Sequence, residues 1–381
     1  MRIARIKAWA VDGPMSDLCF VKVETEEGAH GWGEGSLPGR CGAVAAAVRE
    51  LEPLLIGWDA LNVERAWQRM YRHGYWRGGS ILTSSISAVD MALWDLKAKS
   101  LGLPVHALLG GRVRDRVALY ANIGLSGDGG ELRERAAAAK AMGHTAVKFY
   151  PLPAVGPLPG AGEATRVAAA CAAVRDEMGP HGSFALDFHG RCSAAVAVRM
   201  ERAVRDLDPL WIEEPVPAEA GSALLRCQEK FATPLALGER LVTRWGFREV
   251  LEGRLADVIQ PDAANAGGIS ETMRIASLAE LYGVAFAPHN PNGPVQSMAS
   301  LHLVAAAQNF SILEYRHDCE AAWTGWADQE PVLVEDGHTA VPGRPGLGIE
   351  LDEAALDRMA CAPRRPSINE SFRADGSVAD W

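Results

Sequence analysis

The chain has 381 residues, of which 48% are hydrophobic, and a formal net charge of −10 at pH 7. This apolar content can bury a barrel-sized core together with a smaller domain. The acidic balance argues against nucleic acid or an anionic membrane as the main partner, because both require a basic face, but a small anionic substrate stays possible since a bound metal can reverse the local field.

The seven cysteines are scattered along the chain without any Cys-x-x-Cys pair, which is typical of reduced thiols in a cytoplasmic protein. Residues 1–6 enter an alternating strand pattern and contain no apolar segment of the signal-peptide type. No apolar run reaches the length of a membrane span. We therefore expect a cytoplasmic protein without membrane or nucleic-acid partners.

Residues 1–120 form the first predicted domain, an α+β unit. Two strand-like runs, 3–11 and 18–24, end in glycine-rich turns and predict an antiparallel meander. Helical spacing of apolar residues follows over 42–55 and 80–101. The glycines of the meander do not have the nucleotide-binding pattern, so they indicate turns.

A short loop precedes the second of these helices and contains Tyr75, Trp76, Arg77 and two glycines. An arginine and glycines just before a helix N-terminus are suited to facing a bound anion. A loop with a solvated arginine fits the same residues equally well. Arg77 is thus a candidate substrate contact.

From residue 121 to 318 the pattern alternates between short apolar strands and Ala/Glu/Arg-rich helices, such as 131–142 and 271–282. Eight strands in about 200 residues predict a (β/α) barrel. The predicted strand bodies are 117–122, 146–150, 184–187, 210–213, 235–238, 257–260, 284–287 and 311–314.

Two segments depart from the alternation. Residues 156–162 form a Pro/Gly-rich loop after the second strand, and we expect them to cover the barrel mouth. Residues 319–381 include the turn-rich stretch 341–346, and we expect this segment to return to the N-terminal domain.

Three carboxylates follow neighbouring strands at equal spacing: 26 residues separate Asp187 from Glu213, and 26 separate Glu213 from Glu239. The C-terminal ends of barrel strands meet on one face, so these side chains are predicted to converge. Converging carboxylates repel unless a cation lies between them, and oxygen ligands suit magnesium before calcium or a softer metal. Ordinary surface acids are the alternative, which the regular spacing disfavours.

Other polar residues are predicted at the same strand ends. Asp262 and His289 stand on adjacent strands, where the carboxylate can bond one ring nitrogen and leave the other as a base near neutral pH. The full set of predicted tip residues is Lys148, Tyr150, Asp187, His189, Glu213, Glu239, Asp262, His289 and Glu314.

This constellation resembles the enolase superfamily, mandelate racemase subgroup, and within it the D-galactonate dehydratase-like branch. Matching phrases extend over nearly the whole chain in order. They are Trp-Arg-Gly-Gly from 76, Ala-Leu-Trp-Asp from 92, Leu-Gly-Gly from 109, Asp-Phe-His-Gly-Arg from 187, Ile-Glu-Glu-Pro from 212, Gly-Glu-Arg from 238, Gln-Pro-Asp from 260, Ala-Gly-Gly-Ile from 266, Ala-Pro-His from 287 and Asp-Gly-Ser-Val from 375.

The resemblance implies a (β/α)7β TIM-like barrel capped by an α+β domain made from both termini, with Mg²⁺ held by Asp187, Glu213 and Glu239. It further implies a hydro-lyase that converts a D-galactonate-like aldonate into a 2-keto-3-deoxy acid. Such relatives are homo-oligomers, and an octamer is expected by analogy.

The same resemblance implies individual roles at the strand tips. His289, oriented by Asp262, would remove the α-proton, and His189 would protonate the departing β-hydroxyl. Lys148 and Glu314 would contact the carboxylate end of the substrate. Arg77, Tyr150 and Arg191 are the implied substrate contacts.

Two alternatives stay open on this scaffold: an epimerase, racemase or cycloisomerase, and a weakly active or regulatory homologue. Tyr150 stands where racemases of the subgroup carry a second lysine, and a tyrosine is a poor base at neutral pH. Residues 11–17, 290–292 and 315–318 differ from the galactonate enzymes, so the particular sugar acid does not follow from the resemblance.

Overall fold

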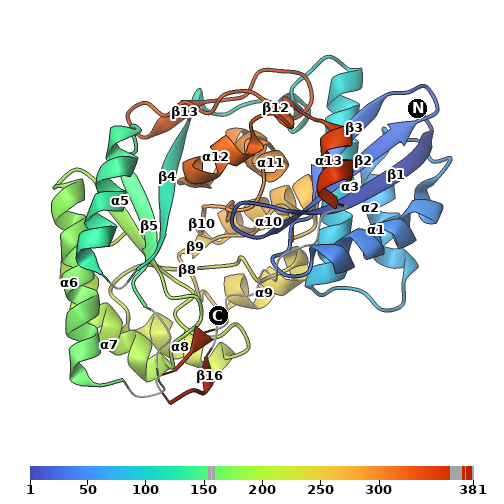
Figure 1. The fold of residues 1–381 in the computed structure, drawn as a ribbon. Helices are drawn as coiled ribbons and strands as arrows, with labels where there is room; N and C mark the ends of the chain where they lie inside the picture. The colour runs from blue at the N-terminus through green and yellow to red at the C-terminus, as the bar shows by residue number, and fades with distance from the viewer. Residues whose placement is uncertain (127, 153–155, 157–158, 361–370, 374, 380–381) are drawn as a thin grey trace.

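The computed structural model describes residues 1–381 except 127, 153–155, 157–158, 361–370, 374 and 380–381. Figure 1 shows an N-terminal sheet with its helices, in blue, beside a larger body whose strands are surrounded by helices, in green to orange. No helix within the described ranges is long and apolar enough to cross a membrane. Six cysteines are described, and all six are buried.

The N-terminal region contains the predicted antiparallel meander, in the order β1-β2-β3. Its helices include one that the sequence analysis did not anticipate, α2, although Val63, Ala66, Trp67 and Met70 recur there at helical spacing and are buried. The elements are β1 (Ile3–Asp12), β2 (Asp17–Thr25), β3 (His30–Glu34), α1 (Cys41–Leu55), α2 (Val63–His73), α3 (Ser80–Ser100) and α4 (Val105–Leu108).

Eight parallel strands of the described chain follow with a helix between each pair, which confirms the (β/α)7β prediction. The strands are β4 (Arg116–Leu125), β5 (Ala146–Tyr150), β6 (Ser183–Asp187), β7 (Ile212–Glu213), β8 (Leu235–Leu237), β9 (Val258–Ile259), β10 (Ala285–Phe286) and β11 (Leu313–Tyr315). The helices are α5 (Gly129–Ala141), α6 (Ala161–Met178), α7 (Ala194–Val204), α8 (Gly221–Lys230), α9 (Thr243–Glu252), α10 (Gly268–Leu281) and α11 (Pro294–Ala306), with a short 3-10 turn, η1 (Arg205–Leu207), after α7.

The sheet closes on itself. Its strands run in the order β10-β9-β8-β7-β6-β5-β4-β11, and the last gap is bridged by the backbone of Phe286, whose N–H donates to Asn309 and whose carbonyl accepts from Ser311, both at 2.9 Å. Closure brings the C-terminal ends of all eight strands to one rim, as the predicted strand tips require.

The two faces of the barrel strands carry different side chains. Outward residues such as Val147, Phe149, Leu186 and Ile212 pack under the surrounding helices. Inward residues form an apolar floor at the lower levels of the barrel: Tyr120, Ala146, Ala185, Trp211, Ala236, Val258 and Ala287. Polar residues continue these inward rows toward the rim. The candidate site therefore lies directly above the apolar floor of the barrel.

The C-terminal segment divides its contacts. One part of it, α13, packs on β1, where Trp9 Nε1 donates to Asp357 Oδ1 at 2.7 Å. By contrast, β13 pairs with barrel strand β4, and β16 lies well away from the N-terminal sheet (Figure 1). Its elements are α12 (His317–Trp323), β12 (Ala327–Gln329), β13 (His338–Ala340), β14 (Ile349–Leu351), α13 (Glu353–Ala360), β15 (Ser371–Phe372) and β16 (Val378–Ala379).

The predicted loop at 156–162 lies partly outside the described residues. Its last two residues belong to α6, so the helix begins earlier than the Pro/Gly pattern indicated.

Polar side chains of α3 join the N-terminal region to the barrel. Asp90 accepts from the backbone N–H and hydroxyl of Ser270 at 2.9 and 2.6 Å. A Cβ on Gly268, where φ is +81°, would meet the Asp90 carboxylate at 2.4 Å, so only glycine allows this approach. The Ala-Gly-Gly-Ile phrase therefore serves the junction between the two parts of the chain.

Candidate active site

Three carboxylates converge at the barrel rim as predicted. Asp187 ends β6, Glu213 ends β7 and Glu239 follows β8, and their ligand atoms lie within 4.8 Å of one another. Gly238 has φ of +143°, and a Cβ there would meet the Gln260 nitrogen at 2.8 Å; this turn carries Glu239 to the rim. Three clustered carboxylate oxygens fit a hard divalent cation.

The electrostatics of these carboxylates also fit a cation. Burial, followed by the charges of Asp187 and Glu239, raises the pKa of Glu213 to about 7 despite the opposing effect of Lys148. Burial likewise raises the pKa of Asp187, but His189 and Lys148 outweigh it and lower that pKa. Negative charge is thus concentrated here beyond what the neighbouring cationic side chains balance.

Lys148 lies in the barrel lumen among acidic groups. Its Nζ donates to Glu213 Oε1 at 2.8 Å, lies 3.4 Å from Glu314 Oε1 and stands 5.6 Å from the centre of the Tyr120 ring. Burial lowers the pKa of Lys148, but Glu213 and Glu314 outweigh burial and hold the pKa well above its ordinary value. Lys148 is therefore a fixed positive charge.

Asp262 and His289 form the expected pair. The imidazole Nδ1 lies 2.7 Å from Asp262 Oδ2, while Nε2 is turned toward the rim, 3.2 Å from Glu239 Oε2. Burial lowers the pKa of His289, but Glu239 and Asp262 raise it to about 10. Because Glu239 belongs to the carboxylate cluster, a cation there would reduce its pull on His289.

His189 lies on the other side of the rim, since β6 and β10 are four strands apart in the closed sheet. Its Nε2 is 3.2 Å from Asp187 Oδ2, and its ring stacks on Tyr150 at 4.2 Å between centroids. His189 adopts φ of +49°, an uncommon conformation for a residue other than glycine, and its backbone N–H donates to Asp187 Oδ1 at 2.7 Å. The strained backbone at His189 is held by its surroundings, which fix the position of the imidazole.

Several asparagines at the rim were missed by sequence reasoning. Asn122, at the end of the first predicted strand, donates to Glu314 Oε1 at 2.6 Å and also bonds the Tyr150 hydroxyl. Asn290 donates its backbone N–H to Glu314 Oε2 at 3.0 Å. Asn122 and Lys148 are register partners on β4 and β5, so both side chains point into the barrel. This shared direction could have identified Asn122 as a site residue.

Gln260 and Trp211 are two further contributors that the sequence analysis did not identify. Gln260 Nε2 donates to Glu213 Oε2 at 2.7 Å, and Trp211 Nε1 donates to the same oxygen at 3.2 Å. Both residues lie on inward rows of their strands, two positions from a predicted site residue. They orient Glu213 within the cluster.

The two expected arginine contacts have different surroundings. Arg77 is exposed, with its guanidinium 5.7 Å from the ring of Tyr71 on α2. Arg191 donates from Nη1 to the carbonyl of Leu152, in the segment after β5. Their roles in substrate binding stay predictions.

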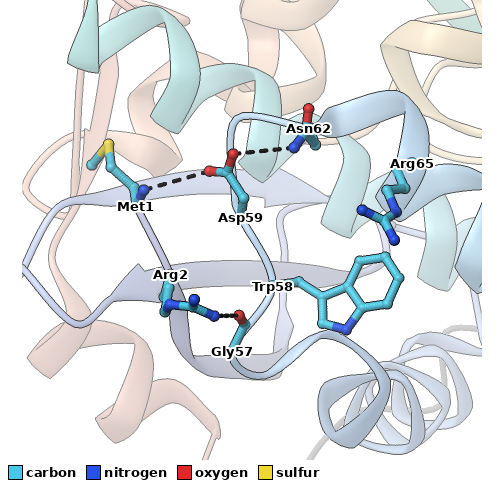
Figure 2. Close-up of a pocket in the computed structure, with 7 residues that line it drawn as sticks. All are labelled: Met1, Arg2, Gly57, Trp58, Asp59, Asn62 and Arg65. Atoms are coloured by element: carbon cyan, nitrogen blue, oxygen red, sulfur yellow. Dashed lines mark hydrogen bonds and ion pairs between the residues drawn. The ribbon is translucent and has the colours of Figure 1, made fainter.

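A separate cavity of about 480 Å³ lies in the N-terminal region (Figure 2). Its polar groups are largely paired with each other: the Met1 ammonium lies 3.4 Å from Asp59 Oδ1, and Arg2 Nη1 donates to the Gly57 carbonyl at 2.8 Å. The lining residues are Met1, Arg2, Gly57, Trp58, Asp59, Asn62 and Arg65. The cavity shares no residue with the strand tips, so the barrel rim is the better candidate.

Comparison with known proteins identifies matches to both parts of the chain. Residues 13–110 match the N-terminal domain of mandelate racemase / muconate lactonizing enzyme, and residues 131–355 match the enolase C-terminal domain-like family.

Full-length relatives carry related names. The chain is 40% identical to D-galactonate dehydratase of Ralstonia nicotianae, over 95% of this chain and 96% of the relative. A crystal structure of a putative dehydratase from Mesorhizobium loti matches with a TM-score of 0.90 at 33% identity, covering 95% of this chain and 99% of that one. A putative galactarate dehydratase from Agrobacterium radiobacter, with bound Na and L-malate, matches with a TM-score of 0.90 at 31% identity over 100% of both chains.

Proposed function

Because the chain belongs to the mandelate racemase/muconate lactonizing enzyme family of the enolase superfamily, we propose that it uses Mg²⁺ to dehydrate D-galactonate or a closely similar aldonate. The enzyme is a hydro-lyase acting on an acid sugar. The observation that carries the mechanism is the placement of two imidazoles, His189 and His289, on opposite sides of the rim with the carboxylate cluster between them.

Asp187, Glu213 and Glu239 would hold the divalent ion. When bound, the ion supplies positive charge that withdraws electron density from the substrate carboxylate and so acidifies the adjacent C–H bond. Gln260 and Trp211 keep Glu213 oriented through their hydrogen bonds.

His289 is the proposed base for the α-proton. Asp262 fixes its Nδ1 at 2.7 Å, which leaves Nε2 directed to the rim. Negative charge grows on the substrate carboxylate as the proton leaves, and the fixed cation of Lys148 together with the hydrogen-bonded Glu314 would stabilise it.

His189 is the proposed general acid. It gives a proton to the β-hydroxyl, the C–O bond breaks, and the hydroxyl leaves as water. The α-proton taken by His289 and the proton supplied by His189 balance the loss of one water molecule. The resulting enol tautomerises to a 2-keto-3-deoxy acid.

Tyr150 disfavours a racemase of the kind that carries a second lysine base at this position. Burial raises the pKa of Tyr150 far above its usual range. The phenol therefore stays protonated at neutral pH and serves as a hydrogen-bonding partner of Asn122.

The test separates the two histidines. Purified protein with Mg²⁺ is screened against aldonic and aldaric acids for 2-keto-3-deoxy products by semicarbazide absorbance. On a substrate so found, His189→Asn should exchange the α-proton with deuterium but lose dehydration by about 100-fold or more, whereas His289→Asn should lose both. The exposed His181→Asn variant is the control. Full dehydration by His189→Asn, or retention of the β-hydroxyl in the wild-type product, contradicts the proposal.

We also propose a cytoplasmic homo-oligomer, an octamer by analogy, with domains at 1–120, 121–318 and 319–381. The scattered cysteines without a Cys-x-x-Cys pair support a reducing compartment. Tyr75 and Trp76 are 86% and 83% exposed on one loop, which supports a contact with another subunit. Light scattering after size exclusion measures the assembly.

A further inference from the structure

Arg316 continues an inward row of side chains at the end of β11. Strand residues alternate between faces, so residues two apart share a side. Glu314 points into the barrel and accepts from Asn122 at 2.6 Å, while Tyr315 points outward and donates to Glu320 of α12 at 2.5 Å. Arg316, which is 7% exposed, therefore lies on the inner side, one step nearer the mouth.

The surroundings of Arg316 connect it to the proposed acid. Its charge interacts with the hydroxyl group of Tyr150, whose ring stacks on His189 at 4.2 Å. Asn122 bonds the same hydroxyl. Arg316 thus belongs to the wall of the mouth that holds His189.

Within the described part of the chain, the guanidinium pairs with one carboxylate, that of Asp318. The ion pair is bidentate: Arg316 Nε donates to Asp318 Oδ1 at 2.8 Å, and Arg316 Nη2 donates to Asp318 Oδ2 at 2.5 Å. The Asp318 side chain is 56% exposed, whereas that of Arg316 is 8% exposed. Among the residues that the structure describes, Nη1 has no hydrogen-bond partner. This unused donor at the end of a mostly buried side chain suits the position to a polar ligand.

The chemistry of the pair selects among sugar acids. Together Arg316 and Asp318 carry no net charge and present donors beside acceptors, which matches hydroxyl groups, since each hydroxyl both donates and accepts. A second carboxylate would be repelled by Asp318 and would have to displace it from the guanidinium.

We propose that the Arg316–Asp318 pair recognises the hydroxyl end of the substrate and restricts the enzyme to sugar acids with a single carboxylate. The inference rests on the proposed dehydratase function. In this arrangement Arg316 contacts the substrate end, and Asp318 positions Arg316 while excluding diacids.

The experiment compares D-galactonate with galactarate, which differ only in whether the far terminus is a hydroxymethyl group or a carboxylate. Values of kcat/KM are measured for wild type, Arg316→Gln, Arg316→Lys and Asp318→Asn. Arg344→Gln, which removes another Arg–Asp ion pair at the surface, is the matched control. Melting temperatures establish that each variant is folded.

Arg316→Gln should lower kcat/KM for D-galactonate by about 10- to 100-fold, and Arg316→Lys should recover part of the loss. Asp318→Asn should shift the preference toward galactarate by about tenfold or more, because the repelling charge is gone. Unchanged selectivity in folded Arg316 and Asp318 variants of an active enzyme overturns this inference alone. A wild-type preference for galactarate also overturns it. Wild-type inactivity on every sugar acid overturns the proposed function and the inference with it.

Discussion

At the scale of single residues, the site is a set of charges that do not balance within the protein. Asp187, Glu213 and Glu239 converge within 4.8 Å, yet Lys148 is the only lysine of the described chain that pairs with any of them, and it is shared with Glu314. A bound cation would have two effects on this cluster. It would supply the positive charge that the reaction needs, and it would relieve the repulsion between the buried carboxylates.

Removal of divalent ions should therefore affect both activity and stability. We expect a chelator to reduce turnover to background and to lower Tm by several degrees, because unneutralised carboxylates destabilise the fold and a bound ion favours the folded state. Mg²⁺ should restore both, and Ca²⁺ should restore Tm more fully than turnover. Activity that persists after exhaustive chelation would be incompatible with the proposed mechanism.

At the scale of elements, one carboxylate of the N-terminal sheet holds the start of a barrel helix. Glu34, on β3, accepts from the backbone N–H groups of Gly293 and Gln296 at 2.8 and 2.9 Å, at the N-terminus of α11. Gln296 in turn donates to the carbonyl of His289 at 3.3 Å. The N-terminal sheet thus supports the loop that carries the proposed base. Burial raises the pKa of Glu34 to about 7, and the backbone N–H groups at the helix N-terminus oppose that rise.

Glu34→Gln should weaken this support. The amide replaces one acceptor by a donor that faces a backbone N–H, so we expect a loss of about 1–3 kcal/mol in stability and a fall in kcat with little change in KM. Glu330→Gln is the control, because Glu330 also accepts a backbone N–H, from Gly343 at 3.0 Å, but at an exposed position. A Glu34→Gln enzyme with normal kcat and Tm would show that α11 needs no such anchor.

The same scale shows what the sequence could predict. The strand tips could be predicted because short apolar runs end in titratable residues, and the equal spacing of Asp187, Glu213 and Glu239 linked three of them. Asn122 and Gln260 escaped notice because neutral amides carry no spacing signal, and their parity becomes meaningful only once β4 and β9 are placed. Closure through Phe286 and the contacts of Glu34 depend on residues far apart in the chain, which local patterns do not encode.

At the scale of the whole molecule, the junction between the N-terminal region and the barrel contains buried histidines. His106 of α4 and His302 of α11 lie with ring centroids 5.4 Å apart, and the backbone N–H of His106 donates to His302 Nδ1 at 3.3 Å. Burial, followed by repulsion from His106, lowers the pKa of His302 to about 3. Burial also lowers the pKa of His144, between α5 and β5, to about 4. The folded protein therefore keeps both of these imidazoles neutral in mild acid.

His302 should contribute a loss of stability as pH falls below about 6.5, whereas buried carboxylates with a raised pKa, such as Glu213, act in the opposite direction. The unfolded chain protonates His302 near that value and the folded chain only near 3, so between these limits the unfolded state binds more protons and each pH unit costs roughly 1.4 kcal/mol per such histidine. Melting temperatures at pH 7.5 and 5 measure the effect. His302→Gln, which cannot protonate, should be less destabilised, relative to wild type, at pH 5 than at pH 7.5, and the exposed His181→Gln should follow wild type. An identical pH dependence of Tm in wild type and His302→Gln would mean that His302 does not contribute to the acid sensitivity of this fold.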